Sequence, residues 1–321
     1  MTEHVFKPAW WLKNSHLQTI WPAICRPNIK DLNLQRERIE LPDGDFIDLD
    51  WAPGSGLSPV VLILHGLEGS IESHYAKSLL KRFADFGWRG VFMHFRGCSG
   101  EPNRLARGYH SGETGDVDFV VRKLRERASD MKLGMVGISL GGNVLLKWLG
   151  EATDRNDYVD AAIAVSVPFE LHKAAARMQH GFSRFYQWYF MKCLRERLVE
   201  KFQVTVPPLD PIVLSEVTTM FEFDDKVTAP LHGFTGVDDY YTTSSSRQFL
   251  RAITVPTLIL HAKDDPFMSV DVIPEPHELS SKITLEVSEC GGHVGFVGGK
   301  YPWRPEYWLD QRVPEFLKDY L

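Results

Sequence analysis

The 321-residue sequence has only four cysteines, no long apolar run and no excess of basic residues. The cysteines lie far apart and none belongs to a C-x-x-C pair, so neither a zinc ribbon nor a secreted disulfide framework is indicated. The longest uncharged stretch, residues 133–146, is interrupted by glycines and is too short to span a bilayer. Residues 1–8 contain no apolar signal core. We therefore expect a soluble protein of the reducing cytoplasm.

The charge balance also excludes a class of partners. Lysine and arginine number 36 against 42 aspartates and glutamates, which gives a formal net charge of −6 and argues against general nucleic-acid binding. The hydrophobic content of 44% is ample for a large core, and the length fits one large α/β domain or two small ones. We expect a single domain over residues 1–321.

The most informative stretch is Gly-Ile-Ser-Leu-Gly at residues 137–141. A short apolar run precedes it and a helical pattern at residues 143–149 follows it, as in a nucleophile elbow. Glycines two positions before and after Ser139 remove the Cβ atoms that would collide in such a sharp turn. Ser139 would then be exposed at a helix N-terminus, where the N–H of Leu140 can stabilise negative charge. The pattern arises by chance in about one chain in ten of this size, so its context must support it.

The context is an alternation of apolar runs and helical patterns, which predicts a mainly parallel sheet with helices on both faces. A hairpin centred on Asp43-Gly44 precedes the alternation. Between residues 168 and 251 the alternation breaks, and we interpret this segment as a helical cap inserted over the sheet edge. The strands are expected at residues 60–64, 90–95, 161–167, 257–261 and 283–287.

Three of these strands lead to further candidate site residues. The first ends in a glycine-rich loop whose Leu67 N–H is the expected second oxyanion donor beside Leu140. The strand at 257–261 leads to Asp264 and Asp265, and the last strand leads to His293 between glycines. The order serine, aspartate, histidine is that of the α/β-hydrolase triad. We favour Asp265 as the triad carboxylate and keep Asp264 as the alternative.

Other candidates are less well supported. Cys98 lies in a loop with no elbow, and His110 precedes the nucleophile although the base of this fold comes last. The acidic pairs at 224–225 and 238–239 lack a histidine or third carboxylate at ligand spacing. We interpret them as helix caps, with Lys226 as an ion-pair partner, and we expect no metal site.

Two aromatic segments have open interpretations. Residues 1–30 form an arm rich in tryptophan and proline, with a short helix at 16–19, that either packs on the body or walls a substrate pocket. The aromatic run at 182–190 within the cap, followed by several basic residues, either lines an acyl pocket or contacts a membrane. Packing on the body is the simplest interpretation of both.

Over its whole length the sequence resembles the YheT-like esterase family of α/β-hydrolases. The resemblance rests on Lys-Pro-Ala-Trp-Trp-Leu at 7–12, His-Gly-Leu-Glu-Gly at 65–69, Arg-Gly-Cys-Ser-Gly at 96–100, Tyr-His-Ser-Gly at 109–112, Phe-Asp-Asp at 223–225 and Asp-Asp-Tyr-Tyr at 238–241. It implies a bacterial relative of carboxylesterases, of phospholipases that act on medium acyl chains, and of acyltransferases that form ethyl esters. It also implies that Ser139, Asp264 or Asp265, and His293 form the charge relay.

The sequence therefore predicts a serine hydrolase of carboxylic esters, with an acyl-enzyme and without a cofactor. Its expected partner is a small-molecule ester. Because the resemblance extends to phospholipases, this ester is expected to belong to lipid metabolism. Two alternatives stay open: an acyltransferase that uses an alcohol in place of water, and a catalytically silent binding protein that keeps the fold.

Overall fold

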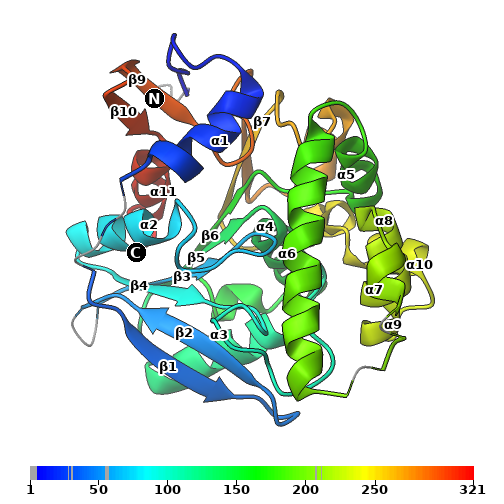
Figure 1. Ribbon diagram of the computed structural model, residues 1–321. Coiled ribbons are helices and arrows are strands. Elements are labelled where there is room, and N and C mark those ends of the chain that lie inside the picture. The colour runs from blue at the N-terminus through cyan, green and yellow to red at the C-terminus, as the bar shows by residue number, and fades with distance from the viewer. Residues whose placement is uncertain (1–5, 28, 30–31, 55–57, 207, 211) are drawn as a thin grey trace.

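The computed structural model describes residues 6–27, 29, 32–54, 58–206, 208–210 and 212–321 (Figure 1). Its centre is an eight-stranded sheet in the order β1-β2-β4-β3-β5-β6-β7-β8. Strands β4, β3, β5, β6, β7 and β8 are parallel, whereas β1 and β2 form an antiparallel hairpin at one edge. The strands are β1 (Gln35–Glu40), β2 (Phe46–Trp51), β3 (Val60–Leu64), β4 (Arg89–Met93), β5 (Leu133–Ile138), β6 (Ala161–Val165), β7 (Thr257–Ala262) and β8 (Ile283–Ser288).

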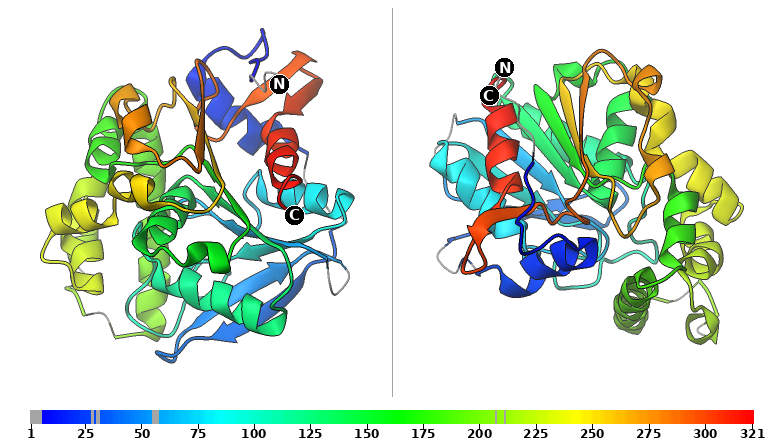
Figure 2. Two further views of the ribbon diagram at one scale, coloured as in Figure 1. Left: turned by 180° about the vertical axis from the view of Figure 1, so that it is seen from behind. Right: turned by 90° about the horizontal axis from the view of Figure 1, so that it is seen from above.

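Helices cover both faces of this sheet (Figure 2). Helices α2 (Ala76–Asp85) and α11 (Leu309–Leu317) pack on one face, and α3 (Gly115–Arg127) and α4 (Leu140–Glu151) pack on the other. The central strands β3, β5 and β6 are buried at every position, because helices exclude water from both of their faces. This arrangement confirms the predicted mainly parallel α/β architecture.

The predicted insertion is a group of helices between β6 and β7 that stands beside the sheet (Figure 1). The longest member, α6, runs along the body, and α5, α7, α8, α9 and α10 lie beyond it in this view, whereas the last inserted element packs against the core beside the sheet. The inserted elements are α5 (Leu171–Met178), α6 (Ser183–Val204), α7 (Ile212–Glu216), α8 (Met220–Phe223), the π-helical turn η2 (Asp224–Thr228), α9 (Ala229–His232), α10 (Val237–Ser244) and the 3₁₀ helix η3 (Ser246–Ala252).

The N-terminal arm packs on the C-terminal part of the chain. Its helix α1 (Ser15–Cys25) is longer than predicted, and the side chain of Asn14 caps it by accepting hydrogen bonds from two amides of the first turn. The fully buried Gln18 donates to the Val297 carbonyl at 2.9 Å and accepts from the Val297 amide at 2.7 Å. Val297 begins β9 (Val297–Tyr301), which pairs with β10 (Arg304–Tyr307). Buried hydrogen bonds of this kind fix the arm against the start of β9.

All five predicted strands end within two residues of their observed ends, and β4 and β6 show the largest difference. The end of β6 has a local cause. The strand stops at Val165, not at residue 167, because Ser166 has a φ of 52° and leaves the extended conformation. Within the described part of the chain, no helix has the length and apolar character needed to cross a membrane.

Candidate active site

Ser139 occupies the sharp turn between β5 and α4. Its φ of 53° and ψ of −117° lie in a region that non-glycine residues rarely adopt, so the turn is strained. A Cβ on Gly137 would lie 2.5 Å from the Gly141 carbonyl oxygen, and a Cβ on Gly141 would lie 2.4 Å from the Leu64 carbonyl oxygen. Only glycine fits at either position, which is why the elbow requires this sequence.

The structure brings Ser139, His293 and Asp265 into one hydrogen-bonded chain. Ser139 Oγ lies 2.9 Å from His293 Nε2, and His293 Nδ1 lies 2.8 Å from Asp265 Oδ2. The second Asp265 oxygen accepts a hydrogen bond from the Phe267 amide at 2.8 Å. Asp265 is 4% exposed and His293 is 8% exposed, so water competes little for these contacts.

Asp264 takes a different position from its neighbour. Its Oδ1 accepts a hydrogen bond from the Gly292 amide at 2.9 Å, and burial raises the pKa of its carboxyl group. It therefore holds the loop that carries His293, while Asp265 contacts the imidazole itself.

Residues that the sequence did not single out hold the His293 loop. The His293 amide donates to Thr19 Oγ1 at 2.9 Å, and the Val294 amide donates to Ser166 Oγ at 3.0 Å. The Phe267 ring stacks on the imidazole with centroids 4.0 Å apart. Val294 has a φ of 58°, a strained value for a β-branched residue, so these contacts must maintain the loop conformation.

The loop after β3 leaves one amide free beside Ser139. The Gly66 amide donates to the Tyr75 hydroxyl at 3.0 Å and the Glu68 amide donates to the Tyr109 hydroxyl at 2.9 Å. Among the described residues, the amides of Leu67 and Leu140 have no acceptor. These are the two amides that the sequence predicted as oxyanion donors.

Glu68 connects this loop to the cap. Its side chain is 5% exposed; one oxygen accepts from the Tyr109 hydroxyl at 2.9 Å and the other from Arg197 Nε on α6 at 2.8 Å. Arg197 also donates to the Gly97 carbonyl. The φ of 54° at Glu68 shows that the loop is held in an unfavourable conformation, which this buried network stabilises.

A cavity of about 460 Å³ opens beside Ser139, between the sheet edge and the cap. Its walls are mostly apolar, and they include Leu171, Met178, Phe190 and Met220 of the cap. Thr19 and Ala23 of α1 also contribute, so the arm both packs on the body and walls the cavity.

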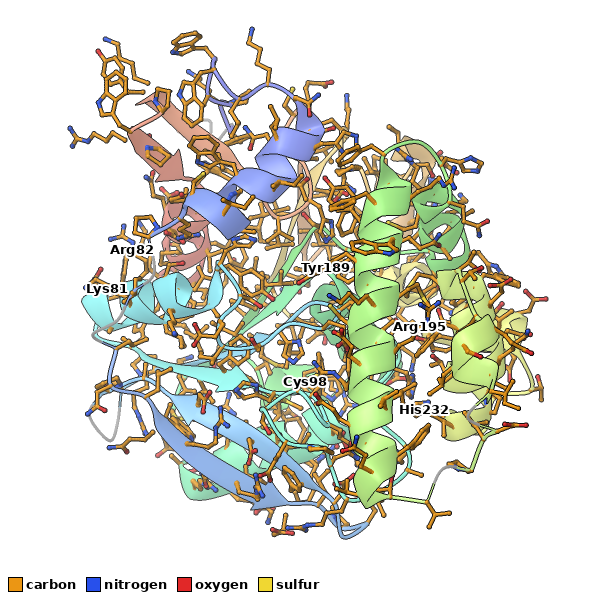
Figure 3. All side chains as sticks on the ribbon, viewed as in Figure 1. Lys81, Arg82, Cys98, Tyr189, Arg195 and His232 are labelled. Carbon is orange, nitrogen blue, oxygen red and sulfur yellow. The ribbon has the colours of Figure 1, made fainter. Side chains whose placement is uncertain are left out.

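The aromatic run on α6 divides between two environments. Tyr189, which is labelled in Figure 3, and Phe190 belong to the cavity lining, whereas Phe185 and Trp188 are 50% and 59% exposed and lie outside it. Phe190 points away from Trp188 around the helix. Tyr189 shares a face with Phe185 and lines the cavity although it is 52% exposed, so the run is only partly a pocket wall.

Two rejected candidates have evident structural contacts. Burial raises the pKa of Cys98, which is labelled in Figure 3, to about 12, so its thiol stays protonated at neutral pH. His110 lines the cavity, its Nδ1 accepts from the Gly112 amide at 3.2 Å, and burial lowers the pKa of its imidazole.

The acidic pairs differ from the prediction. Asp225 accepts from the Val237 amide and Asp239 from the Thr235 amide, in keeping with capping of α10. Asp224 lies at the C-terminal end of α8, but its side chain caps no helix N-terminus, because its two oxygens accept from the hydroxyls of Thr228 and Tyr241. No ion pair joins Lys226 to a described carboxylate. The described residues contain no group of three or more histidine, cysteine or acidic side chains that could hold a metal ion.

Comparison with known proteins places this geometry in context. Residues 59–300 match the family described as "alpha/beta hydrolase fold". The chain is 44% identical to "Putative esterase YheT" of Escherichia coli (strain K12) over 98% of this chain and 94% of that protein. It is 27% identical to "Phospholipase ABHD3" of Mus musculus over 98% of this chain and 78% of that protein. The Pyrococcus furiosus esterase Pf2001 has a similar fold, with a TM-score of 0.59, 17% identity, and coverage of 90% of this chain and 92% of that one.

Proposed function

Because this chain belongs to the α/β-hydrolase fold family, we propose that it is a serine hydrolase that cleaves carboxylic esters. The observation that carries the proposal is the hydrogen-bonded chain from Ser139 through His293 to Asp265 at the wall of an apolar cavity. Serine is a weak nucleophile unless an adjacent base removes its proton, and the imidazole is within reach for that transfer.

The proposed reaction has two steps, formation and hydrolysis of an acyl-enzyme, and Ser139, His293 and Asp265 take part in both. Asp265 keeps the proton on His293 Nδ1, so that Nε2 accepts the Ser139 proton as Oγ attacks the ester carbonyl. The imidazolium then donates this proton to the departing alcohol, which leaves an acyl group on Ser139. In the second step His293 activates a water molecule in the same way, and the carboxylic acid is released.

The tetrahedral intermediates carry a negative oxygen, for which the free amides of Leu67 and Leu140 are the proposed donors. Backbone donors that are already oriented in the free enzyme stabilise the transition state without a cost of reorganisation. The Leu67 amide is held by its neighbours, since the amides on either side donate to tyrosine hydroxyls and Glu68 is fixed by Arg197.

We expect Glu68→Gln to lower kcat about 10- to 100-fold, because loss of the Arg197 ion pair lets the Leu67 amide move from its position. KM for a short ester should change little. The affinity for a trifluoromethyl ketone, which forms a tetrahedral adduct, should fall in parallel with kcat. Glu286→Gln is the matched control, because Glu286 forms a comparable ion pair with the buried Arg312 away from the site. A Glu68→Gln enzyme that is destabilised but has the parent kcat would restrict Glu68 to a structural role.

The general test is a series of p-nitrophenyl esters from acetate to palmitate, together with labelling by a fluorophosphonate. Hydrolysis and labelling support the proposal, whereas a folded protein that does neither is the silent binding protein considered above. Added ethanol distinguishes the acyltransferase, because ethyl esters then replace the free acid as the product. The apolar cavity favours substrates with an apolar acyl chain, and so does the similarity to the mouse phospholipase.

The cavity wall offers a matched pair for testing acyl selectivity. Phe190→Ala should shift the preferred acyl length, because contacts in apolar pockets are worth about 1–3 kcal/mol per methylene-sized change. Trp188→Ala, on the same helix but outside the cavity lining, should keep the parent profile. The measurement is kcat/KM across the ester series. Identical profiles for Phe190→Ala and the parent would show that the acyl chain does not reach this wall.

A further inference from the structure

Asp224 is a carboxylate on the cap side of the cavity that contains Ser139. It begins η2, a π-helical turn, and turns of this kind are frequent at functional sites. Its residue is 8% exposed, so the carboxyl group is removed from bulk water. The proposed triad does not use it.

The contacts of Asp224 are all with neutral groups. Its Oδ1 accepts from the Thr228 hydroxyl and its Oδ2 from the Tyr241 hydroxyl, each at 2.7 Å. A carboxylate has about four acceptor positions, so two hydroxyls leave part of its capacity unused. Thr228 and Tyr241 also line the cavity, which places all three groups on one polar patch of an otherwise apolar wall.

Asp224 differs in this respect from the other buried acidic residues. Each of those has a basic partner: Asp45 and Asp116 pair with Arg96, Asp48 with Arg38, Asp50 with Arg36, Glu113 with Arg107, and Asp265 with His293. Among the described residues, no lysine, arginine or histidine forms an ion pair with Asp224.

A buried carboxylate without a cation is costly, and burial raises the pKa of Asp224 to about 6. At neutral pH the group is still mainly ionised and faces a cavity large enough for a ligand. An acidic residue is a poor choice if only two hydroxyls need an acceptor, because a neutral side chain would avoid the cost of burying a charge. The missing partner is best supplied by the molecule that fills the cavity.

We propose that Asp224 binds a hydrogen-bond donor of the substrate, a hydroxyl or an ammonium group, so that the enzyme prefers esters with such a group away from the scissile carbonyl. This inference rests on the proposed ester hydrolysis. The rings of Tyr240, Tyr241 and Phe223 also line the cavity and provide contact area for either donor.

The experiment compares esters of equal size that differ in one terminal group. p-Nitrophenyl heptanoate, 6-hydroxyhexanoate and 6-aminohexanoate form one such set, and shorter and longer sets scan the distance from Ser139. Butyl and 3-hydroxypropyl butyrate test the same group on the alcohol side. The wild-type enzyme should favour a donor-bearing ester over its plain isostere about 10-fold or more in kcat/KM in at least one set, the size expected of a hydrogen bond to a charged group.

Substitutions assign this preference to Asp224. Asp224→Asn should reduce the ratio of donor-bearing to plain ester to near one, and Tyr241→Phe should alter the ratio by changing the orientation of the carboxylate. Asp225→Asn is the matched control, because the neighbouring carboxylate accepts from the Val237 amide and does not line the cavity, and it should keep the wild-type ratio.

Hydrolysis of the plain esters tests the proposed function separately, so the two ideas can fail independently. If the wild-type enzyme cleaves plain esters but favours no donor-bearing ester in any set, Asp224 is a structural residue and the inference is wrong. The same conclusion follows if Asp224→Asn folds and keeps the preference. The wild-type comparison requires no variant to fold.

Discussion

Replacing Ser139 with alanine should lower kcat/KM for ester hydrolysis by about 10⁴-fold or more while the protein stays folded. Loss of the nucleophile removes the covalent route, and the remaining oxyanion donors and the cavity support only slow attack by water. Among the described residues, the hydroxyl has a hydrogen-bond partner only in His293, and alanine keeps the Cβ that the turn already accommodates. Stability should therefore change little.

The measurement is steady-state hydrolysis together with thermal unfolding and fluorophosphonate labelling. Cys98→Ala is the matched control for a different nucleophile, because Cys98 is buried with a pKa raised to about 12 and should be dispensable for the reaction. A folded Ser139→Ala protein that keeps most of its activity would contradict the mechanism. Loss of activity in a folded Cys98→Ala protein would show that Cys98, in the loop after β4, takes part in the reaction.

The second large effect is expected for Asp265→Asn, which should reduce kcat about 10⁴-fold. The amide can donate a hydrogen bond to Nδ1, which favours the tautomer with its proton on Nε2. In that tautomer Nε2 cannot accept the proton of Ser139. The positive imidazolium also loses the carboxylate that stabilises it. The geometry that supports this expectation is the 2.8 Å contact between His293 Nδ1 and Asp265 Oδ2.

Asp264→Asn is the natural comparison, because it makes the same chemical change one residue away. The Oδ1 of an asparagine can still accept from the Gly292 amide, so the loop should keep its conformation and most of the activity. Thermal unfolding of both variants provides an independent measurement, since a difference in kcat between two equally stable proteins reports on the contact with the imidazole. A larger loss of activity in Asp264→Asn than in Asp265→Asn would reverse the assignment.

The fold was largely predictable because its signals are local. A buried strand such as residues 60–64 is a continuous apolar run. The glycines on either side of Ser139 are required because a Cβ at either position would collide with a backbone carbonyl oxygen. The last two residues predicted for β6 were wrong, since Ser166 has a positive φ and its side chain accepts a hydrogen bond from the Val294 amide, far away in sequence. Local propensity carries no information about such a partner.

The candidate site was predictable by residue type but not in its supporting contacts. Sequence order selected Ser139 and His293 and left a preference for Asp265 over Asp264, whereas the folded geometry shows that Asp265 contacts the imidazole and Asp264 contacts the Gly292 amide. Thr19 offered no signal, since a threonine in an amphipathic helix has no spacing that points to a loop 274 residues away. Asp224 was misread as a helix cap because acidic pairs near helix ends usually are caps.

The contact between Thr19 and His293 has a consequence for how the protein is made. A ribosome synthesises α1 well before the loop at His293, so the two cannot meet until the chain has grown through the 274 positions that separate Thr19 from His293. A nascent chain that already contains Ser139 has neither its base nor the docked arm that holds that base. The growing polypeptide should therefore have no hydrolase activity until the His293 loop has been made and has docked on α1.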